Sequence, residues 1–192
     1  NDTENNTRIY LPPTAEVMRI FAYTDRISAP WYAGAGTTRA LTNFINVRKK
    51  TRETERDTLY EGRINSLFYD RGNIFVFGNK TMQITDTLLS QISIVRMVLY
   101  LRRQISRLGM ALLFEPNDAT VRVKFERQIR QVLNDVVSKR GLFNFDNVLS
   151  NDPASIDRGE LNGEIVLVPT PSLEEINLTF KVTASSAEFN VA

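Results

Sequence analysis

The stretch Phe114-Glu115-Pro116-Asn117-Asp118 separates two long runs of sequence with the periodicity of amphipathic helices, and it decides the fold. Pro116 cannot continue the helix before it, because its ring removes a backbone N–H and clashes with the preceding turn. Asn117 or Asp118 can cap the free N–H groups of the helix that follows. We therefore predict two long helices joined by a short turn. Because the junction carries no reactive group, it favours a scaffold that docks against a partner.

Each of the two helices has an apolar side and a basic side. On the first helix, the apolar side holds Ile94, Val98, Leu101, Ile105, Leu108 and Leu112, and the basic side holds Arg96, Arg103 and Arg107. On the second, the apolar side holds Val121, Phe125, Ile129, Val132, Leu133, Val136 and Val137, and a basic side holds Lys124, Arg127 and Arg130. Lys139-Arg140-Gly141 ends it, because cations favour the last turn and glycine the position after it.

The N-terminal half predicts shorter elements. Residues 17–23 form an apolar run after Leu11-Pro12-Pro13 and favour a buried strand. Helices are expected over residues 41–48, where apolar residues have helical spacing, and over residues 54–60, where Thr54 and Asp57 have capping-box spacing. Residues 74–77 are β-branched and aromatic and follow a turn at 70–73, so they predict a buried strand.

The C-terminal part changes to strand periodicity. Strands are expected around Phe143 and Phe145, over residues 164–168 and over the alternating residues 176–183, with a polar loop at 150–160. The predicted fold class is α+β: a mixed β-sheet packed with two long amphipathic helices. We expect the helices to pack on a sheet that contains residues 75–77 and 176–182. The predicted domain covers residues 1–183, and residues 184–192 form an extended arm.

The composition excludes several classes of function. The 192 residues include no Cys and no His, which removes disulfides, thiolate and HExxH metal sites and Ser-His-Asp triads. A net charge of +2 is too balanced for nucleic-acid binding through bulk charge. Four arginines interrupt the apolar residues 92–114, so this segment is not expected to span a membrane. We predict no enzyme, no catalytic residue, no cofactor and no metal site.

Two motif look-alikes do not change this prediction. Gly72 to Gly78-Asn79-Lys80-Thr81 resembles a phosphate-binding loop, but five residues instead of four separate the glycines and Asn79 precedes the lysine. Glu55 and Asp57 could be paired carboxylates, yet capping explains both.

The face formed by Arg96, Arg103 and Arg107 has three possible interpretations: a solvated helix face, a docking surface for an acidic partner, or a nucleic-acid site. No aromatic stacking platform accompanies these arginines, which disfavours the last.

The order of short motifs along the chain resembles the C-terminal, tube-proximal half of the contractile tail sheath proteins of bacteriophages. The motifs are Leu11-Pro12-Pro13, Ala22-Tyr23-Thr24-Asp25, Ala29-Pro30-Trp31-Tyr32-Ala33-Gly34, Glu55-Arg56-Asp57-Thr58-Leu59-Tyr60, Ile64-Asn65, Phe75-Val76-Phe77-Gly78-Asn79-Lys80-Thr81, Phe114-Glu115-Pro116-Asn117-Asp118 and Ile156-Asp157. Each motif is weak alone, but their common order covers nearly the whole chain. Because the chain begins at Asn1 without an initiator Met, we expect it to be a fragment of a longer protein.

The resemblance implies a virion protein that is made in the host cytoplasm. Its partners would be further copies of itself in a helical sheath of stacked six-membered rings, the tail tube protein and the baseplate, without nucleic acid or membrane insertion. The sheath would contract and drive the tube through the host envelope. In this family a helix faces the tube, which implies tube contacts at Arg96, Arg103 and Arg107. Terminal arms add strands to neighbouring sheets, which implies an arm at Ala184, Phe189 and Val191.

The resemblance leaves alternatives. The same features fit the sheath of a bacterial contractile injection system, and the basic helix face leaves a nucleic-acid-binding domain as the alternative from another class. We expect the isolated chain to be a monomer, since the resemblance implies that the arm completing the intersubunit sheet lies upstream of Asn1.

Overall fold

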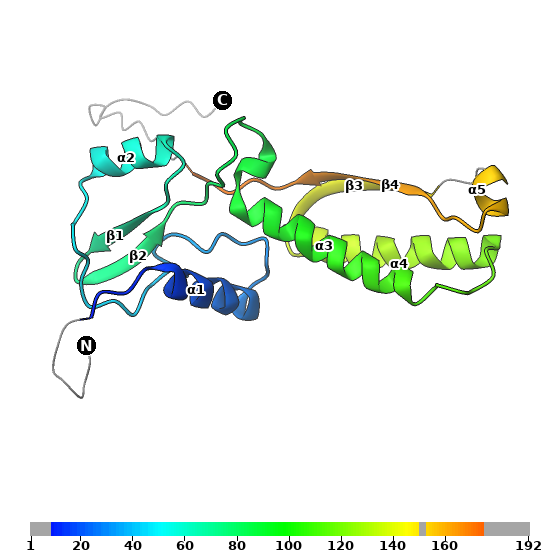
Figure 1. Cartoon of the computed structure of the whole chain (residues 1–192), viewed down its shortest axis with the longest axis horizontal. Helices are drawn as coiled ribbons and strands as arrows, with labels where there is room; N and C mark the ends of the chain where they lie inside the picture. Colours follow the sequence, from blue (N-terminus) through cyan, green and yellow to red (C-terminus); the bar gives the residue numbers. More distant parts are fainter. Residues whose placement is uncertain (1–8, 150–152, 175–192) are drawn as a thin grey trace, which may run out of the picture.

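The computed structural model describes residues 9–149 and 153–174, which form an elongated molecule with two lobes (Figure 1). The N-terminal lobe contains α1 (Thr14–Ile27), α2 (Glu53–Glu61), β1 (Ser66–Asp70) and β2 (Asn73–Phe77). A 3₁₀ turn (Leu88–Ser90) leads into the C-terminal lobe, which contains α3 (Ile92–Met110), α4 (Ala119–Ser138), β3 (Leu142–Leu149), α5 (Pro153–Asp157) and β4 (Gly163–Pro169). Helices and small antiparallel sheets confirm the predicted α+β class.

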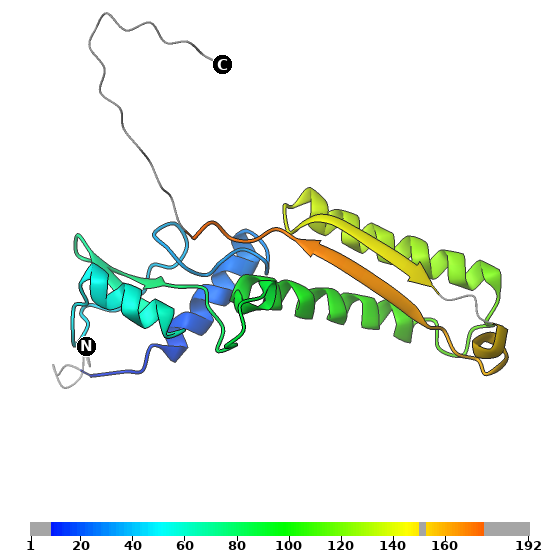
Figure 2. The same cartoon turned by 90° about the horizontal axis from the view of Figure 1, so that it is seen from above.

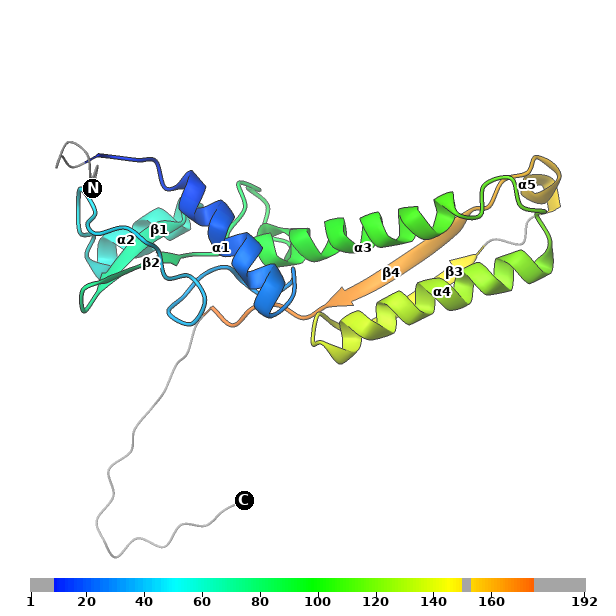
Figure 3. The ribbon, with the colours of Figure 1, turned by 90° about the horizontal axis from the view of Figure 1, so that it is seen from below.

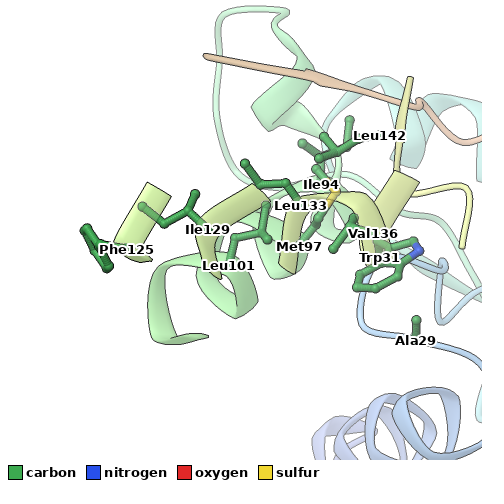
Figure 4. Packing of buried hydrophobic residues seen from close by; sticks show 10 residues of the cluster. All are labelled: Ala29, Trp31, Ile94, Met97, Leu101, Phe125, Ile129, Leu133, Val136 and Leu142. Carbon is green, nitrogen blue, oxygen red and sulfur yellow. The ribbon is translucent and has the colours of Figure 1, made fainter. Parts of the chain in front are cut away.

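The C-terminal lobe has two layers, with α3 and α4 on one side and the β3–β4 hairpin on the other (Figures 2 and 3). Its core contains the predicted residues Ile94, Leu101, Phe125, Ile129, Leu133 and Val136, together with Met97, Leu142, Ala29 and Trp31 (Figure 4). Trp31 reaches this core from the loop after α1, and its ring nitrogen donates a hydrogen bond to the Lys139 carbonyl at 2.9 Å. Most of the two predicted apolar stripes therefore contributes to the main core, whereas Val98 and Val121 do not belong to this cluster.

The turn between α3 and α4 has the predicted N-cap, but α3 already ends at Met110, so Pro116 is not the residue that stops it. The Asp118 carboxylate accepts a hydrogen bond from the Val121 N–H at 2.8 Å, so Asp118 is the N-cap. Asn117 has a different role, because its side chain donates to the Glu160 carbonyl at 3.3 Å and accepts from the Arg122 guanidinium at 3.0 Å. Asn117 thus holds the segment after α5 against the start of α4. The predicted polar loop at 150–160 also contains the short helix α5.

The end of α4 is fixed by close packing at Gly141. Arg140 takes the left-handed conformation with φ 61°, and the Gly141 N–H bonds back to the Val136 carbonyl at 2.8 Å. A Cβ added at Gly141 would lie 2.5 Å from a Val136 methyl carbon and 3.0 Å from the Trp31 ring. Glycine is therefore needed here for close approach, while the left-handed residue of the helix end is Arg140.

The predicted strand at residues 17–23 is wrong, because this segment lies within helix α1. Pro13 stands at the N-cap, where a missing N–H costs nothing. Val17, Ile20 and Thr24 then recur at helical spacing: Ile20 and Thr24 are fully buried, and Val17 packs on the small core of this lobe. Within the seven residues 17–23 this helical period cannot be distinguished from a continuous apolar run, which is why a strand was predicted.

The predicted helix at residues 41–48 is also wrong, since this segment contains no helix. Its start runs beside β2 instead: the Thr42 N–H donates to the Ile74 carbonyl at 2.8 Å, and the Val76 N–H donates to the Ala40 carbonyl at 3.0 Å. Tertiary pairing with a neighbouring strand therefore overrides a weak helical spacing. The predicted helix at 54–60 is confirmed as α2, but its capping contact runs from the Arg52 N–H to the Glu55 carboxylate at 2.9 Å.

The strands of the described residues form two separate two-stranded antiparallel sheets rather than one mixed sheet. The predicted strand at 74–77 is confirmed as β2, and Arg71 and Gly72, both with positive φ, form the turn that joins it to β1. Val76 packs on Ile20 and Ala40, so residues 75–77 do not support the long helices as predicted. That role belongs to the β3–β4 hairpin. Residues 176–182, the other predicted partner, lie outside the described residues.

Candidate interaction surfaces

The three arginines predicted as one contact face of α3 lie in different surroundings. Arg96 is largely covered, with 17% of its side chain exposed, and pairs with Asp25 of α1. Its guanidinium lies 4.5 Å from the centre of the Phe21 ring. Arg103 and Arg107 lie one turn apart and are exposed, and no ion pair is found for them in the described part of the chain. The structure therefore groups Arg103 with Arg107 and places Arg96 between the lobes.

The second basic face, on α4, is partly neutralised. Arg130 pairs with Glu126 one turn earlier at 3.1 Å. Lys124 and Arg127 are exposed, and no ion pair is found for either among residues 9–149 and 153–174. Exposed cations without a counter-charge can attract an acidic partner, whereas paired surface ions contribute little.

The β3–β4 hairpin offers a different kind of surface. Its inner residues, such as Phe145 and Leu167, pack on the helices. Its outer face is exposed and carries Asn144, Asp146 and Val148 of β3 and Glu164, Val166 and Val168 of β4. Among the described strands, β3 and β4 pair only with each other, so each leaves one backbone edge open. An open backbone edge can accept a further strand, and the exposed valines of the outer face could pack with it.

One side chain under the hairpin lacks partners. Asn147 is 2% exposed and points inward from β3, and neither oxygen nor nitrogen of its amide makes a hydrogen bond. A buried amide without partners destabilises the native state by about 1–3 kcal/mol. The packing of the hairpin on the helices is therefore weaker than its apolar contacts alone would make it.

The far end of the molecule exposes an apolar group at the turn after α3. Phe114 is fully exposed and has a φ of 72°, and Met110 and Leu113 beside it are also exposed. Left-handed backbone is uncommon for a phenylalanine and directs this ring away from the protein. Arg122, buried at the base of the same turn, donates to the Glu160 carbonyl at 3.2 Å and keeps the turn in place.

A polar cluster between the lobes has no direct signal in the sequence. Asn79 and Ser93 are buried and bind each other, and both lie against Ser172 of the segment that follows β4. In the sequence, Asn79 belongs to a short family motif and interrupts a phosphate-loop pattern, and neither feature indicates its contact with Ser93. The predicted arm residues Ala184, Phe189 and Val191 lie outside the described residues.

The pKa shifts in the described residues have local causes. A hydrogen bond from Lys49 lowers the pKa of Glu55, and one from Arg63 lowers the pKa of Asp86. A hydrogen bond with Asp135 raises the pKa of Lys139. Burial, followed by a hydrogen bond with Glu174, raises the pKa of the Tyr60 hydroxyl.

Neither a metal cluster nor a membrane-spanning helix is found in the described residues. They contain no group of three His, Cys, Asp or Glu side chains placed to hold a metal ion. None of their helices is both long and apolar enough to cross a bilayer. The described residues thus form an elongated scaffold with exposed basic helices and a hairpin whose two edges are open.

The family of this scaffold follows from comparison with known sequences. The model of the phage tail sheath C-terminal domain family matches residues 85–183, slightly more than half of the chain. The chain therefore belongs to the phage tail sheath C-terminal domain family. It is 30% identical to the tail sheath protein of Enterobacteria phage T4 over 194 residues, and 31% identical to that of Vibrio phage KVP40 over 193 residues. Each alignment covers 98% of this chain but only 29% of the relative.

Solved structures share the fold. The chain matches a protein of the anti-feeding prophage baseplate with a TM-score of 0.83 at 19% identity, over 92% of this chain and 51% of the other. It matches a protein of the contracted sheath complex of PVC, an extracellular contractile injection system, with a TM-score of 0.82 at 21% identity, over 91% and 52% of the two chains. At this identity the likeness establishes a common fold.

Proposed function

We propose that this chain is the inner part of a contractile tail sheath subunit, which polymerises around a tail tube and contracts to drive the tube through the host envelope. Membership of the sheath family supports this function. Its setting would be the virion tail, with assembly in the host cytoplasm. Its partners would be further sheath subunits, the tube protein and the baseplate. The proposed role is structural, without catalysis or a cofactor.

The open β3–β4 hairpin is the observation that carries the proposal. A two-stranded hairpin with two free edges and exposed valines on its outer face is rarely a finished sheet. Strands from other subunits would complete it and join the subunits into a continuous polymer. We propose that residues 184–192, including Ala184, Phe189 and Val191, form one such strand and pair with the hairpin of a neighbouring subunit.

Contraction in this proposal is a conformational change that uses no nucleotide. The extended sheath would be kinetically trapped, and its subunits would gain contacts with one another as it shortens. Strand pairing would keep the subunits connected throughout. Contacts with the tube would have to break, and exposed charges suit such an interface, because they set its register without deep apolar burial.

The tube contact is the second part of the proposal. Arg103 and Arg107 are the best candidates, because both are exposed and no counter-charge is found beside them among the described residues. Arg96 was predicted with them, but its ion pair with Asp25 already uses its charge within the chain. The proposed contact therefore rests on Arg103 and Arg107, with Lys124 and Arg127 of α4 as the competing pair.

Deletion of residues 185–192 from the whole encoded protein tests the arm. The deletion should give a soluble, folded subunit that forms no sheath polymers in electron micrographs. A matched control replaces these residues with a Gly/Ser segment of equal length, which keeps the chain length but removes Phe189 and Val191. If either variant polymerises like the parent, the arm does not link subunits.

Charge reversal tests the tube contact. The double variant Arg103→Glu/Arg107→Glu should remain folded and form sheath alone, but should fail to assemble on purified tubes. The matched control is Lys124→Glu/Arg127→Glu, which changes the net charge equally on the other helix. Assembly of the first variant together with failure of the second would move the contact to α4.

A sheath of a bacterial contractile injection system is the second candidate. The fold matches to the anti-feeding prophage and to the PVC complex favour it, as both are described as contractile or baseplate assemblies. The two candidates differ in what the tube delivers. Cryo-electron microscopy of native particles would separate them, because a phage tail is attached to a DNA-filled capsid.

A further inference from the structure

After β4, the chain returns to the N-terminal lobe and is held there by a compact polar cluster. Figure 2 shows this segment leaving the hairpin and crossing beside the start of α3. The cluster consists of Asn79, Gln91 and Ser93 on one side and Ser172 and Glu174 on the other, and we call it the clamp. Glu174 is the last residue that the structure describes, so the clamp lies at the end of the described chain.

The buried centre of the clamp also caps α3. The Asn79 amide oxygen accepts from the Ser93 N–H at 3.2 Å, which satisfies one of the free N–H groups of the first helical turn. Its nitrogen donates to the Ser93 hydroxyl at 2.9 Å and to the Ser172 hydroxyl at 3.3 Å. Asn79 and Ser93 are 6% and 2% exposed. A change at this centre would therefore disturb the helix as well as the returning segment.

Gln91 and Glu174 close the clamp from outside. The Gln91 side chain accepts from the Ser172 N–H and donates to a Glu174 carboxylate oxygen, both at 2.9 Å. The other Glu174 oxygen lies 3.8 Å from the Lys80 ammonium. A hydrogen bond with Glu174 also contributes to the raised pKa of Tyr60 on α2. The returning segment is thus tied to α2, to the end of β2 and to the start of α3.

We propose that the clamp is a mechanical anchor, which passes tension from the chain beyond Glu174 directly into the N-terminal lobe. The geometry supports this function because the clamp lies between the exit point and the hairpin. With the clamp closed, a pull on the exiting chain bypasses β3 and β4. With the clamp open, the same pull would act on Pro169 and open the hairpin from its Leu142–Pro169 end. The tension itself rests on the proposed function, in which a neighbouring subunit holds the arm.

The hairpin needs such protection. Its inner face contains the unpartnered amide of Asn147, and its outer edges are open in the described part of the chain. Backbone pairs at the end of a hairpin open one at a time under a pull from that end. The hydrogen bonds that hold Ser172 and Glu174 share one small site, so a pull on the returning segment loads them together.

Force spectroscopy on the full chain tests the anchor. The chain has no Cys, so Ala22→Cys on α1 and Ala192→Cys provide the only two attachment points. The measured quantity is the lifetime of the first opening step at a fixed force, because forced opening reports an unfolding rate. Gln91→Ala removes two hydrogen bonds of the clamp and should shorten this lifetime about tenfold or more. It should also make the hairpin open in the same step.

Two further variants keep the test decisive. Glu174→Ala removes the outer contact without touching α3 and should also shorten the lifetime, even if Gln91→Ala folds poorly. Gln83→Ala is the matched control: it removes a glutamine hydrogen bond to Thr87 at 2.8 Å that does not involve the returning segment, and should match the parent. An unchanged lifetime in the Glu174 variant, or hairpin opening before the clamp in the parent, would overturn the proposal. Sheath polymerisation does not enter this measurement, so failure of the anchor and failure of the sheath function give separate results.

Discussion

The guanidinium of Arg96, in the second turn of α3, forms an ion pair with Asp25, near the end of α1. The same guanidinium covers the ring of Phe21 on α1, so this contact joins the two lobes. Sequence periodicity placed Arg96 with Arg103 and Arg107, because all three lie opposite the apolar stripe of α3. Periodicity describes one helix at a time and cannot show that another helix covers part of its polar face.

The first prediction concerns this joint. Arg96→Ala should lower the free energy of unfolding by about 1–3 kcal/mol, because it removes a half-buried ion pair together with a cation–π contact. Arg103→Ala and Arg107→Ala are matched controls on the exposed side and should stay within about 0.5 kcal/mol of the parent. Urea unfolding of the three variants measures this. Equal stabilities would show that Arg96 does not join the lobes.

The second prediction concerns the core of the C-terminal lobe. Leu101 and Ile129 are 2% and 1% exposed, and truncation of either to Ala should cost about 2–5 kcal/mol, since it leaves a cavity in packed surroundings. Leu99→Ala is the control on α3, because Leu99 is 52% exposed. Thermal unfolding gives the comparison. Core variants as stable as Leu99→Ala would contradict the packing in Figure 4.

The third prediction concerns Asn147. Replacing this unpartnered amide with the similarly sized Leu should raise the free energy of unfolding by about 1–3 kcal/mol, because a buried polar group without hydrogen bonds is removed. Asn144→Leu changes an exposed residue of the same strand and should bring no such gain. Denaturant unfolding of both variants measures their free energies of unfolding. A destabilised Asn147→Leu variant would mean that the amide has hydrogen-bond partners in solution.

The fourth prediction concerns alkaline pH. The folded state raises the pKa of Tyr60 above its unfolded value of about 10, so the folded chain retains a proton that the unfolded chain loses. The resulting stability is fully present below about pH 10 and is lost as the pH rises further. Urea unfolding at about pH 8 and pH 11 should show a smaller alkaline loss in Tyr60→Phe than in the parent. An equal loss of stability in the parent and in Tyr60→Phe would mean that other tyrosines cause the alkaline destabilisation.

Much of the C-terminal lobe could be predicted from the sequence, because its helices are long and strongly periodic. Asp118 and Gly141 mark helix ends through their own chemistry, and the alternating residues of β3 and β4 give a strand period. The N-terminal lobe was harder, because its segments are short. Residues 17–23 span fewer than two helical turns, and residues 40–42 acquire extended structure only by pairing with β2.

The interaction surfaces were predictable only in part. An exposed basic stripe can be found on a single helix, as Arg103 and Arg107 show. The clamp could not be found this way, because Asn79 and Ser172 are far apart in sequence and each is an ordinary polar residue until the fold brings them together. The pairing of β3 with β4 alone, as a separate sheet among the described strands, is likewise a property of the folded chain.

The most direct test of the sheath function is electron microscopy of the whole encoded protein after purification. We predict hollow tubes of regular diameter with a helical repeat, because open hairpins and arms should link subunits into a polymer. It also predicts that these tubes will not form when residues 185–192 are deleted. A purified protein that stays monodisperse at high concentration, alone and in the presence of tail tubes and baseplates, would contradict it.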